Sequence, residues 1–324
     1  MRMIPADEVD RCLNFPDLVE ALREAFRAGA IQPTRHHHHV EKPDGAASTL
    51  LLMPAWTDFA AAGSSEGGYV GVKVVTVSPD NNALGKPAVM GLYLLLDGRT
   101  CEPRALIDGQ RLTLWRTAAA SALAATYLAR KDASRLLVVG AGALAPFLAR
   151  AHSAVRQIRE IRIWNRTAAN AERIAEALRQ EGIAAVASEN LDESVGWADI
   201  VSCATISSTA LVKGALLKPG VHVDLVGAFT PAMRESDDEA VRRARVFVDT
   251  RAGAMKEAGD IVQALESGAL AEKDIVADLA QLTRGEKAGR VSDGEITLFK
   301  SVGAALEDLC VGKLVFERIG RSGG

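Results

Sequence analysis

The chain has 324 residues, 48% of them hydrophobic and 24% charged, and its formal net charge is −3. This apolar fraction is typical of a folded globular protein and excludes a mainly disordered chain, while the length predicts two domains of ordinary size. The near balance of charges gives no reason to expect nucleic acid or an anionic membrane as a partner.

The sequence also lacks obvious targeting and membrane signals, and we expect a cytoplasmic protein. The longest stretch without Asp, Glu, Lys or Arg, residues 136–149, contains glycine and proline and is shorter than the about 20 apolar residues that a membrane span needs. The opening MRMIPADEVD has no apolar core of a signal peptide. The four cysteines form no CxxC pair, so we expect reduced thiols rather than a zinc site or disulfides.

The first part of the chain predicts helices followed by strands. Roughly the first 30 residues are expected to be helical, with Asn14 as an N-cap and Pro16 in a first turn. Strand-like runs separated by turn residues such as Gly63 follow at Thr49–Met53, Tyr69–Val77, Val89–Leu96 and Arg104–Ile107. A long Ala-rich helix is then expected over Thr113–Ala129.

The second part alternates strands with helices, which predicts βαβ units and a parallel sheet. The expected helices are Ala143–Val155 and Ala169–Glu181. The expected strands are Arg135–Val139, Glu160–Trp164, Ala184–Ala187, Ile200–Cys203, Val221–Val226 and Val246–Val248. The closing segment Glu295–Ile319 is predicted to be helical, because its apolar residues recur at helical spacing.

A glycine motif, Gly140-Ala141-Gly142-Ala143-Leu144-Ala145, directly follows the strand that ends at Val139. It fits the G-x-G-x-x-G/A fingerprint of dinucleotide-binding domains. In that pattern Gly140 allows a tight turn, Gly142 lets the backbone approach a pyrophosphate, and Ala145 permits close packing of helix on strand. The alternative is a glycine-containing turn in an α/β fold that binds no nucleotide.

The end of the second strand of that unit bears on cofactor choice. An NAD-binding protein would place Asp or Glu there, whereas this chain has Asn165, Arg166 and Thr167. A cation and a hydroxyl suit a 2′-phosphate, so NADP(H) is preferred and NAD(H) remains possible. The alternative is that Arg166 is a solvated surface charge and that the acid comes from elsewhere.

Four cations in the first part of the chain are candidates for a substrate site: Arg35, Lys73, Lys86 and Arg116. Lys73 interrupts an apolar strand, where a charge needs a partner or a ligand. An Arg and a Lys that converge on one cleft commonly hold a carboxylate. Ordinary ion pairs are an equally good interpretation of each of these residues.

The run His36-His37-His38-His39 suggests a metal site at first sight. In a strand, alternate histidines share a face, which gives two pairs but no identifiable third ligand. We therefore expect no metal. A single histidine that lines the substrate site and relays protons is the better functional interpretation.

Several segments together carry a family resemblance. They are Gly71–Val77, Asp108-Gly109 with 112–119, the glycine motif, 164–167, 198–201 with Ala204-Thr205, 226–228 with Pro231 and Glu235, and 295–303 with Asp308. In these segments the chain resembles the ornithine cyclodeaminase/mu-crystallin family. The resemblance implies an α/β fold in which a Rossmann dinucleotide-binding domain, 117–294, is inserted in a discontinuous α+β domain, 1–116 plus 295–324. That second domain would bind substrate and form a homodimer.

The resemblance also implies roles for individual residues. Arg35, Lys73 and Arg116 match the family's substrate-carboxylate and active-site positions. The positions expected to contact the dinucleotide, from the resemblance and the motif together, are Thr117, Gly140, Gly142, Ala143, Leu144, Asn165, Arg166, Thr167, Thr205 and Val226. Relatives usually carry Gln where Leu144 stands. Cyclodeaminases carry a catalytic Asp where this chain has Phe229, and phenylalanine cannot take up a proton.

These features lead to a reductase hypothesis. The substrate would be a small cyclic imino-carboxylate, either Δ1-pyrroline-2-carboxylate, giving L-proline, or Δ1-piperideine-2-carboxylate, giving L-pipecolate. The arginines would anchor the carboxylate, and Lys73 or a nearby histidine would supply the proton. The alternatives are a lyase such as ornithine cyclodeaminase or 3-hydroxyproline dehydratase, an alanine dehydrogenase, and a non-catalytic mu-crystallin-like binder of NADPH or hormone.

Overall fold

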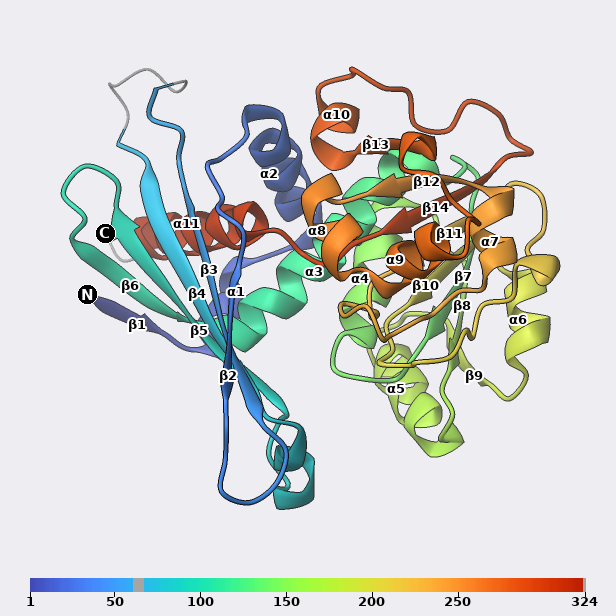
Figure 1. Ribbon diagram of the computed structural model, residues 1–324, viewed down its shortest axis with the longest axis horizontal. Coiled ribbons are helices and arrows are strands. Elements are labelled where there is room, and N and C mark those ends of the chain that lie inside the picture. Colours follow the sequence, from blue (N-terminus) through green and yellow to red (C-terminus); the bar gives the residue numbers. More distant parts are fainter. Residues whose placement is uncertain (61–66, 323–324) are drawn as a thin grey trace. The chain divides into compact units, whose positions relative to one another are not determined.

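The computed structural model describes residues 1–60 and 67–322, so that Gly63, one of the expected turn residues, lies outside the described residues. Contacts within the chain define two compact units (Figure 1). Unit 1 comprises Met1–Arg116 and Ala304–Gly324, and unit 2 comprises Thr117–Gly303. The division falls inside helix α3, Gly109–Leu128, which is longer at its start than expected.

Unit 1 contains a six-stranded sheet in the order β1-β6-β5-β4-β3-β2. Strand β1 is parallel to β6, and the other neighbours are antiparallel. The strands are β1 Arg2–Ile4, β2 His36–Val40, β3 Ser48–Trp56, β4 Tyr69–Val77, β5 Val89–Asp97 and β6 Pro103–Asp108. The four strands expected between Thr49 and Ile107 are therefore confirmed, with ends that differ by a few residues.

Three helices complete unit 1: α1 Ala6–Cys12, α2 Phe15–Ala28 and α11 Ala305–Ser322. The Asn14 side chain accepts a hydrogen bond from the Asp17 N–H, which confirms the expected N-cap of α2. Helix α2 buries its apolar face, including Leu18 and Leu22, and α11 packs on α2 and on β3, β4 and β5. One face of the sheet is thus the core of the unit.

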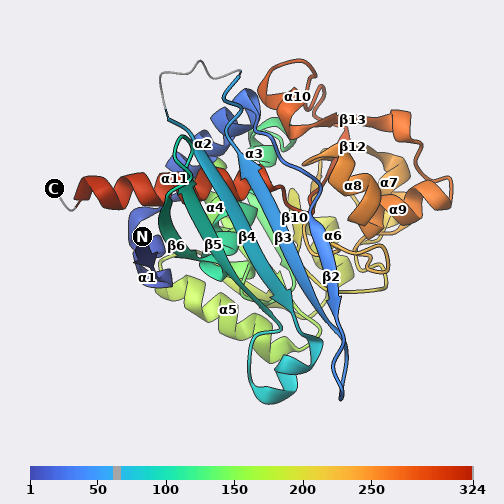
Figure 2. The ribbon, with the colours of Figure 1, turned by 60° about the vertical axis from the view of Figure 1, so that its left-hand side comes forward.

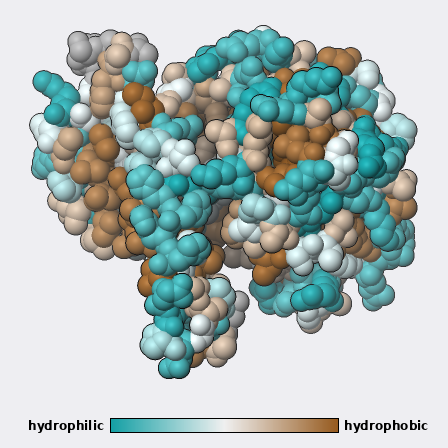
Figure 3. Space-filling view, viewed as in Figure 1, coloured by the Kyte–Doolittle hydropathy of each residue, from teal (hydrophilic) through white to brown (hydrophobic). Residues whose placement is uncertain are grey.

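The opposite face of this sheet carries apolar side chains that no helix of the described part of unit 1 covers. Leu52, Val74 and Leu92 share one row across three strands, and Val74 and Leu92 are 37% and 48% exposed. Figure 2 shows these strands in front, with α2 and α11 behind them. Figure 3 shows apolar residues gathered over the same strands. We call this surface the outer face of the sheet.

Unit 2 contains an eight-stranded sheet in the order β13-β12-β14-β11-β10-β7-β8-β9, and every pair in it is parallel. The strands are β7 Arg135–Val139, β8 Glu160–Trp164, β9 Ala185–Ser188, β10 Ile200–Cys203, β11 His222–Leu225, β12 Ala244–Val248, β13 Ile275–Asp278 and β14 Ile296–Lys300. The expected parallel sheet of βαβ units is confirmed. Its central strands are buried on both faces, as is typical of sheets covered by helices on both sides.

The helices of unit 2, besides most of α3, are α4 Ala145–Val155, α5 Ala168–Gln180, α6 Leu191–Trp197, α7 Asp238–Arg243, α8 Arg251–Glu257, α9 Gly259–Glu266 and α10 Leu279–Thr283. Helices α4 and α5 lie where they were expected. The five that follow were not predicted; each has eight residues or fewer, which is too short for a clear helical repeat. No helix within residues 1–60 and 67–322 has both the length and the apolar character that crossing a bilayer requires.

The prediction of a helix over Glu295–Ile319 is wrong for its first part. Residues Ile296–Lys300 form strand β14, which pairs with β11 on one side and β12 on the other, and α11 begins only at Ala305. All five residues of β14 are buried, because a central strand of a parallel sheet is covered on both faces and reads as a continuous apolar run. The second segment of unit 1 accordingly starts at Ala304 instead of Glu295.

Candidate active site

Lys73 lies in the middle of strand β4, on the face of the sheet that packs on α11. The register places it in one row with Met53 of β3, Tyr93 of β5 and Ile107 of β6. These neighbours are buried, and Lys73 itself is 2% exposed. An ammonium group in such a row needs a partner, because an unpaired buried charge is strongly destabilising.

The partner of Lys73 is Asp308, in the first turn of α11. Lys73 Nζ lies 2.9 Å from Asp308 Oδ1 and 2.7 Å from Oδ2. Arg116 of α3 reaches the same turn: its Nη1 donates to Glu307 Oε2 at 2.8 Å, and its Nε lies 3.3 Å from Asp308 Oδ1. Two predicted site cations are thus brought together by two adjacent, fully buried carboxylates.

Arg35 is placed beside this cluster by the edge strand β2. Arg35 immediately precedes β2, and its positive charge is among those that act on Lys73. The pKa of Lys73 is lowered from 10.5 to about 8, chiefly by burial and then by the positive charges of Arg116 and Arg35, against the opposing effect of Asp308. The structure therefore gathers all three predicted site cations of unit 1.

The turn that carries the two carboxylates is itself held by side chains. Gln32 Oε1 accepts the Leu306 N–H at 3.0 Å, and Glu307 Oε1 accepts the Ala304 N–H at 3.3 Å. Glu307 and Gln32 were not identified from the sequence. The available signal was the pair of acidic residues in the otherwise apolar start of α11, Ala304-Ala305-Leu306-Glu307-Asp308-Leu309, where buried carboxylates need cations.

The two remaining sequence candidates, Lys86 and the run of four histidines, are exposed. Lys86 is exposed after the 3₁₀ segment Pro79–Leu84. All of β2, which holds the four histidines, is exposed at the edge of the sheet; His36 and His38 face outward with Leu52 and Leu50, while His37 and His39 share the inner face with Lys73. Among the described residues, no group of three or more His, Cys, Asp or Glu side chains forms a metal site.

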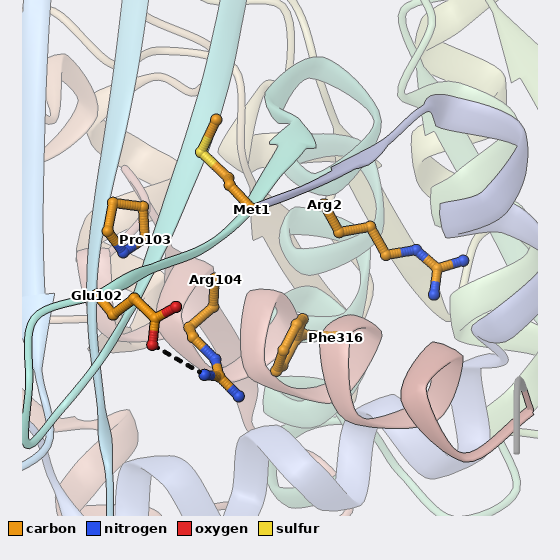
Figure 4. Close-up of a pocket in the computed structure, with 6 residues that line it drawn as sticks. All are labelled: Met1, Arg2, Glu102, Pro103, Arg104 and Phe316. Carbon is orange, nitrogen blue, oxygen red and sulfur yellow. Dashed lines mark hydrogen bonds and ion pairs between the residues drawn. The ribbon is translucent and has the colours of Figure 1, made fainter.

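A pocket in unit 1 does not contain any predicted site residue. Figure 4 shows Arg104 paired with Glu102, at 3.3 Å, and lying against Phe316, 5.8 Å from the ring centre. The Arg2 side chain points away from them, toward its own partner Glu8. Both arginines are already paired, so this pocket offers no convergent anion site. Its lining residues are Met1, Arg2, Glu102, Pro103, Arg104 and Phe316.

In unit 2 the glycine motif forms the turn between β7 and α4. Gly140 has φ +105°, and a Cβ there would lie 2.6 Å from the Ala204 carbonyl oxygen, so only glycine fits. At Gly142 a Cβ would meet nothing within 4 Å, which leaves the open approach to the backbone that a pyrophosphate needs. Ala143 is exposed and Leu144 is the N-cap of α4, without a side-chain hydrogen bond to the helix.

The segment after β8 is hydrogen-bonded to the glycine turn through Asn165 and places the side chain of Arg166 in solvent. Asn165 Oδ1 accepts the Ala141 N–H at 3.2 Å, and its Nδ2 donates to the Thr167 carbonyl at 3.0 Å. Asn165 therefore shapes both turns instead of projecting freely. Arg166 and Thr167 are exposed at the start of α5.

The remaining predicted cofactor residues lie at the ends of neighbouring strands and in α3. Thr205 follows β10 and donates both its N–H and its hydroxyl to Glu235 Oε1, at 2.6 and 2.9 Å. Val226 follows β11, and its N–H donates to the Cys203 carbonyl at 2.8 Å. Thr117 is the first residue of unit 2 and is 9% exposed. Phe229 packs against the apolar core of unit 2.

These features of unit 2 fit a dinucleotide. The open approach at Gly142, the positive end of α4 and the exposed Arg166 are donors for phosphate groups. The turns lie at the carboxyl ends of parallel strands, on either side of the point where the strand order reverses, between β7 and β10. Open α/β sheets bind their ligands at this position.

Comparison with known proteins decides the family. The sequence model described as the ornithine cyclodeaminase/mu-crystallin family matches residues 2–323. The chain belongs to this family. The resemblance inferred from the Arg116-Thr117-Ala118-Ala119 and 295–303 segments is thereby confirmed, and the two units have the sheet types that the resemblance implies.

Individual members of the family are similar over nearly the whole chain. The Arabidopsis thaliana protein SAR DEFICIENT 4 is 40% identical, covering 97% of this chain and 96% of the relative. A Δ1-pyrroline-2-carboxylate reductase of Bacillus cereus is 36% identical, covering 98% and 96%. The solved structure of the Thermococcus litoralis Δ1-pyrroline-2-carboxylate reductase, in complex with NADH and L-proline, is 33% identical with a TM-score of 0.92, covering 100% and 98%.

Proposed function

We propose that this protein reduces cyclic ketimine carboxylates with a reduced nicotinamide dinucleotide and converts Δ1-pyrroline-2-carboxylate to L-proline. The observation that carries the proposal is the buried cluster of Lys73, Arg116 and Asp308, with Arg35 beside it. It occurs in a chain that matches Δ1-pyrroline-2-carboxylate reductases from end to end. The six-membered homologue, Δ1-piperideine-2-carboxylate, belongs to the same proposal, with L-pipecolate as its product.

The charge of the cluster suits a monocarboxylate. Lys73 and Arg116 are paired with the carboxylates of Glu307 and Asp308, and Arg35 adds a positive charge that acts on Lys73. A substrate carboxylate would be attracted to this group of three cations. Arg116 and Arg35 would hold the carboxylate and thereby fix which face of the C=N bond is presented for reduction.

Reduction of the ring C=N bond also needs a proton on nitrogen. The pKa of Lys73 is about 8. Near neutral pH a group with such a pKa can both hold a proton and release it, as general acid–base catalysis requires. Asp308 holds the ammonium in place from both carboxylate oxygens. We assign Lys73 as the group that supplies or holds the proton of the imine nitrogen.

We assign dinucleotide binding to unit 2 and substrate binding to unit 1. Gly140, Gly142, Ala143 and Leu144 would receive the pyrophosphate. Arg166 and Thr167 favour NADP(H), because an exposed guanidinium beside a hydroxyl suits a 2′-phosphate. Thr117, Thr205 and Val226 complete the proposed contacts. When bound, the reduced nicotinamide supplies the two electrons and the hydrogen that the C=N carbon gains.

The proposal includes a homodimer in the cytoplasm. The outer face of the unit 1 sheet, with Val74 and Leu92 at its centre, is the apolar surface that a second subunit would cover. The cytoplasmic assignment rests on the spacing of the four cysteines, which form no CxxC pair in the sequence.

A substrate assay tests the proposal. Purified protein is mixed with NADPH or NADH and Δ1-pyrroline-2-carboxylate, and loss of the reduced nicotinamide absorbance is followed together with proline formation. We expect stoichiometric conversion, faster with NADPH. Ornithine is the matched alternative substrate, since a cyclodeaminase would release ammonia from it; ammonia release without any reduction of the imine would refute the proposal.

A further inference from the structure

A buried carboxylate joins two loops of unit 2 at the carboxyl ends of neighbouring strands. Glu235 is fully buried. Its Oε1 accepts the N–H and the hydroxyl of Thr205, at 2.6 and 2.9 Å, in the loop after β10. Its Oε2 accepts the N–H groups of Gly227 and Ala228, at 2.7 and 3.2 Å, in the loop after β11. One side chain therefore fixes the backbone of both loops.

Glu235 is itself held by groups from two further elements. Asp260 of α9 accepts the Glu235 N–H at 2.9 Å and the Ser236 N–H at 2.8 Å through Oδ1. Lys300, at the end of β14, places its Nζ 3.4 Å from Asp260 Oδ2 and 3.8 Å from Glu235 Oε2. All three charged groups are fully buried. Burial raises the pKa of Glu235, and the Lys300 ammonium opposes that effect by compensating the two carboxylates.

The two loops pack closely at Gly227, where a side chain would collide with the loop after β10. A Cβ on Gly227 would lie 2.0 Å from the Thr205 carbonyl oxygen and 2.5 Å from Glu235 Oε1. No side chain fits between them, and both loops donate to the same carboxylate.

The strand order tells which part of a dinucleotide these loops would meet. The glycine turn follows β7 and Arg166 follows β8, on one side of the point where the strand order reverses. In a doubly wound sheet the two mononucleotide halves lie on opposite sides of that point. The loops after β7 and β8 would contact the phosphate and 2′-phosphate groups of the adenosine half. The loops after β10 and β11 would therefore contact the nicotinamide half.

We propose that Glu235, held by Asp260 and Lys300, is a positioning residue that shapes the seat of the nicotinamide half of the cofactor. It acts through Thr205, Gly227 and Ala228 and does not touch the cofactor itself. This inference rests on the dinucleotide binding included in the proposed function. It adds that different residues control the binding of each half of the ligand: the glycine turn and Arg166 for the adenosine half, and Glu235 for the nicotinamide half.

The test compares two ligands that share the adenosine half. Binding of NADPH and of 2′-phospho-ADP-ribose, which lacks the nicotinamide ring, is measured by titration calorimetry without substrate. In Glu235→Gln an amide NH2 group replaces one carboxylate oxygen, so at least one of the backbone N–H groups of Thr205, Gly227 and Ala228 loses its acceptor. We expect the Kd of NADPH to rise about tenfold, because loops that are no longer held together must be ordered when the nicotinamide half binds, with the Kd of 2′-phospho-ADP-ribose changed by less than about twofold.

Two variants serve as companions. Glu189→Gln makes the same chemical change at an exposed position of unit 2 and should leave both Kd values unchanged. Glu235→Asp keeps the charge but shortens the side chain, so that it cannot reach both loops; if Glu235→Gln fails to fold, this variant should weaken NADPH alone.

Two outcomes would overturn the inference: NADPH bound by the folded Glu235 variants as tightly as by the wild type, or both ligands weakened to the same extent. The second would mean that Glu235 only supports the fold. Neither depends on turnover. Absence of imine reduction by the wild type would refute the proposed reaction, and the binding comparison would still decide the role of Glu235.

Discussion

Lys73 Nζ lies 2.7 Å from Asp308 Oδ2, although 235 positions separate the two residues along the chain. The strand that carries Lys73 and the helix that carries Asp308 both belong to unit 1, and all of unit 2 lies between them in the sequence. The pair anchors the cation cluster on which the proposed substrate site is built.

Removing the negative charge of that pair should destabilise the protein. In Asp308→Asn, Lys73 and Arg116 stay buried with less compensation, and breaking a buried pair typically costs about 3–5 kcal/mol. Urea unfolding measures the loss. The control is Asp7→Asn, whose ion pair with Arg11 is 72% and 70% exposed and should contribute no more than about 1 kcal/mol. Equal losses in both variants would contradict the assignment.

The pH dependence of activity should report Lys73. If the protonated ammonium supplies the proton, activity is constant below the pKa and falls as pH rises through it. Since the pKa of Lys73 is about 8, kcat/KM should decline above about pH 8 by tenfold per pH unit. In Lys73→Arg the side chain stays charged, so the rate should be low and the alkaline decline absent. A decline that persists in Lys73→Arg would assign it to another group.

Arg116→Ala should weaken substrate binding. Hydrogen bonds between charged groups contribute roughly 1.5–3 kcal/mol, so we expect KM for the imine to rise about tenfold to a hundredfold, with a smaller effect on kcat. Steady-state kinetics at saturating NADPH gives both constants. Arg104→Ala removes an arginine of unit 1 outside the cluster, with a side chain 40% exposed, and should leave KM unchanged. An unaltered KM in Arg116→Ala would remove the anchoring role.

Arg166→Ala should change cofactor preference. Loss of a guanidinium partner of the 2′-phosphate should raise KM for NADPH about tenfold and leave KM for NADH nearly unchanged. Arg159, exposed just before the opposite end of β8, provides the control. Parallel changes for NADPH and NADH in Arg166→Ala would show that the side chain does not read the 2′-phosphate.

The outer face of the unit 1 sheet should mediate dimerisation. Leu92→Asp places a charge at a residue 48% exposed in the monomer, so folding should be retained while the dimer dissociates. Sedimentation velocity measures the mass. Val186→Asp, at a residue 45% exposed on β9 of unit 2, should remain dimeric. A wild type that sediments as a monomer, or a dimer that survives Leu92→Asp, would exclude this face.

Strands bounded by turn residues were predictable from the sequence; β4, β7, β8 and β10 have the ends that local patterns indicated. Strand β14 was not, because it lies between β11 and β12 with both faces buried, and a buried strand of five residues has no periodicity to distinguish it from a helix. The burial of β14 depends on neighbouring elements that are far away in the sequence, so a short stretch of residues does not reveal it.

The candidate site was predictable only in its cations. Lys73 and Arg116 stood out because charge in an apolar setting needs a partner, but their partners could not be located before the position of α11 was known. The role of Glu235 was equally hard to predict, because in the sequence it is a single acidic residue in a loop. Its hydrogen bonds reach Thr205 and Gly227, which lie 30 and 8 positions earlier in the chain.

Helix α11 follows the whole of unit 2 along the chain, and this imposes an order on assembly. The strands of unit 1 are synthesised first, but the helix that covers their inner face emerges only after residues 117–303. Unit 2 is one uninterrupted segment, so it can fold as soon as it has been synthesised. During that time the first sheet has no covering helix α11. Until α11 is made, apolar residues on the inner face of these strands have no covering helix, and such exposed surface favours aggregation. The contact between Lys73 and Asp308 can form only after all of unit 2 has been synthesised.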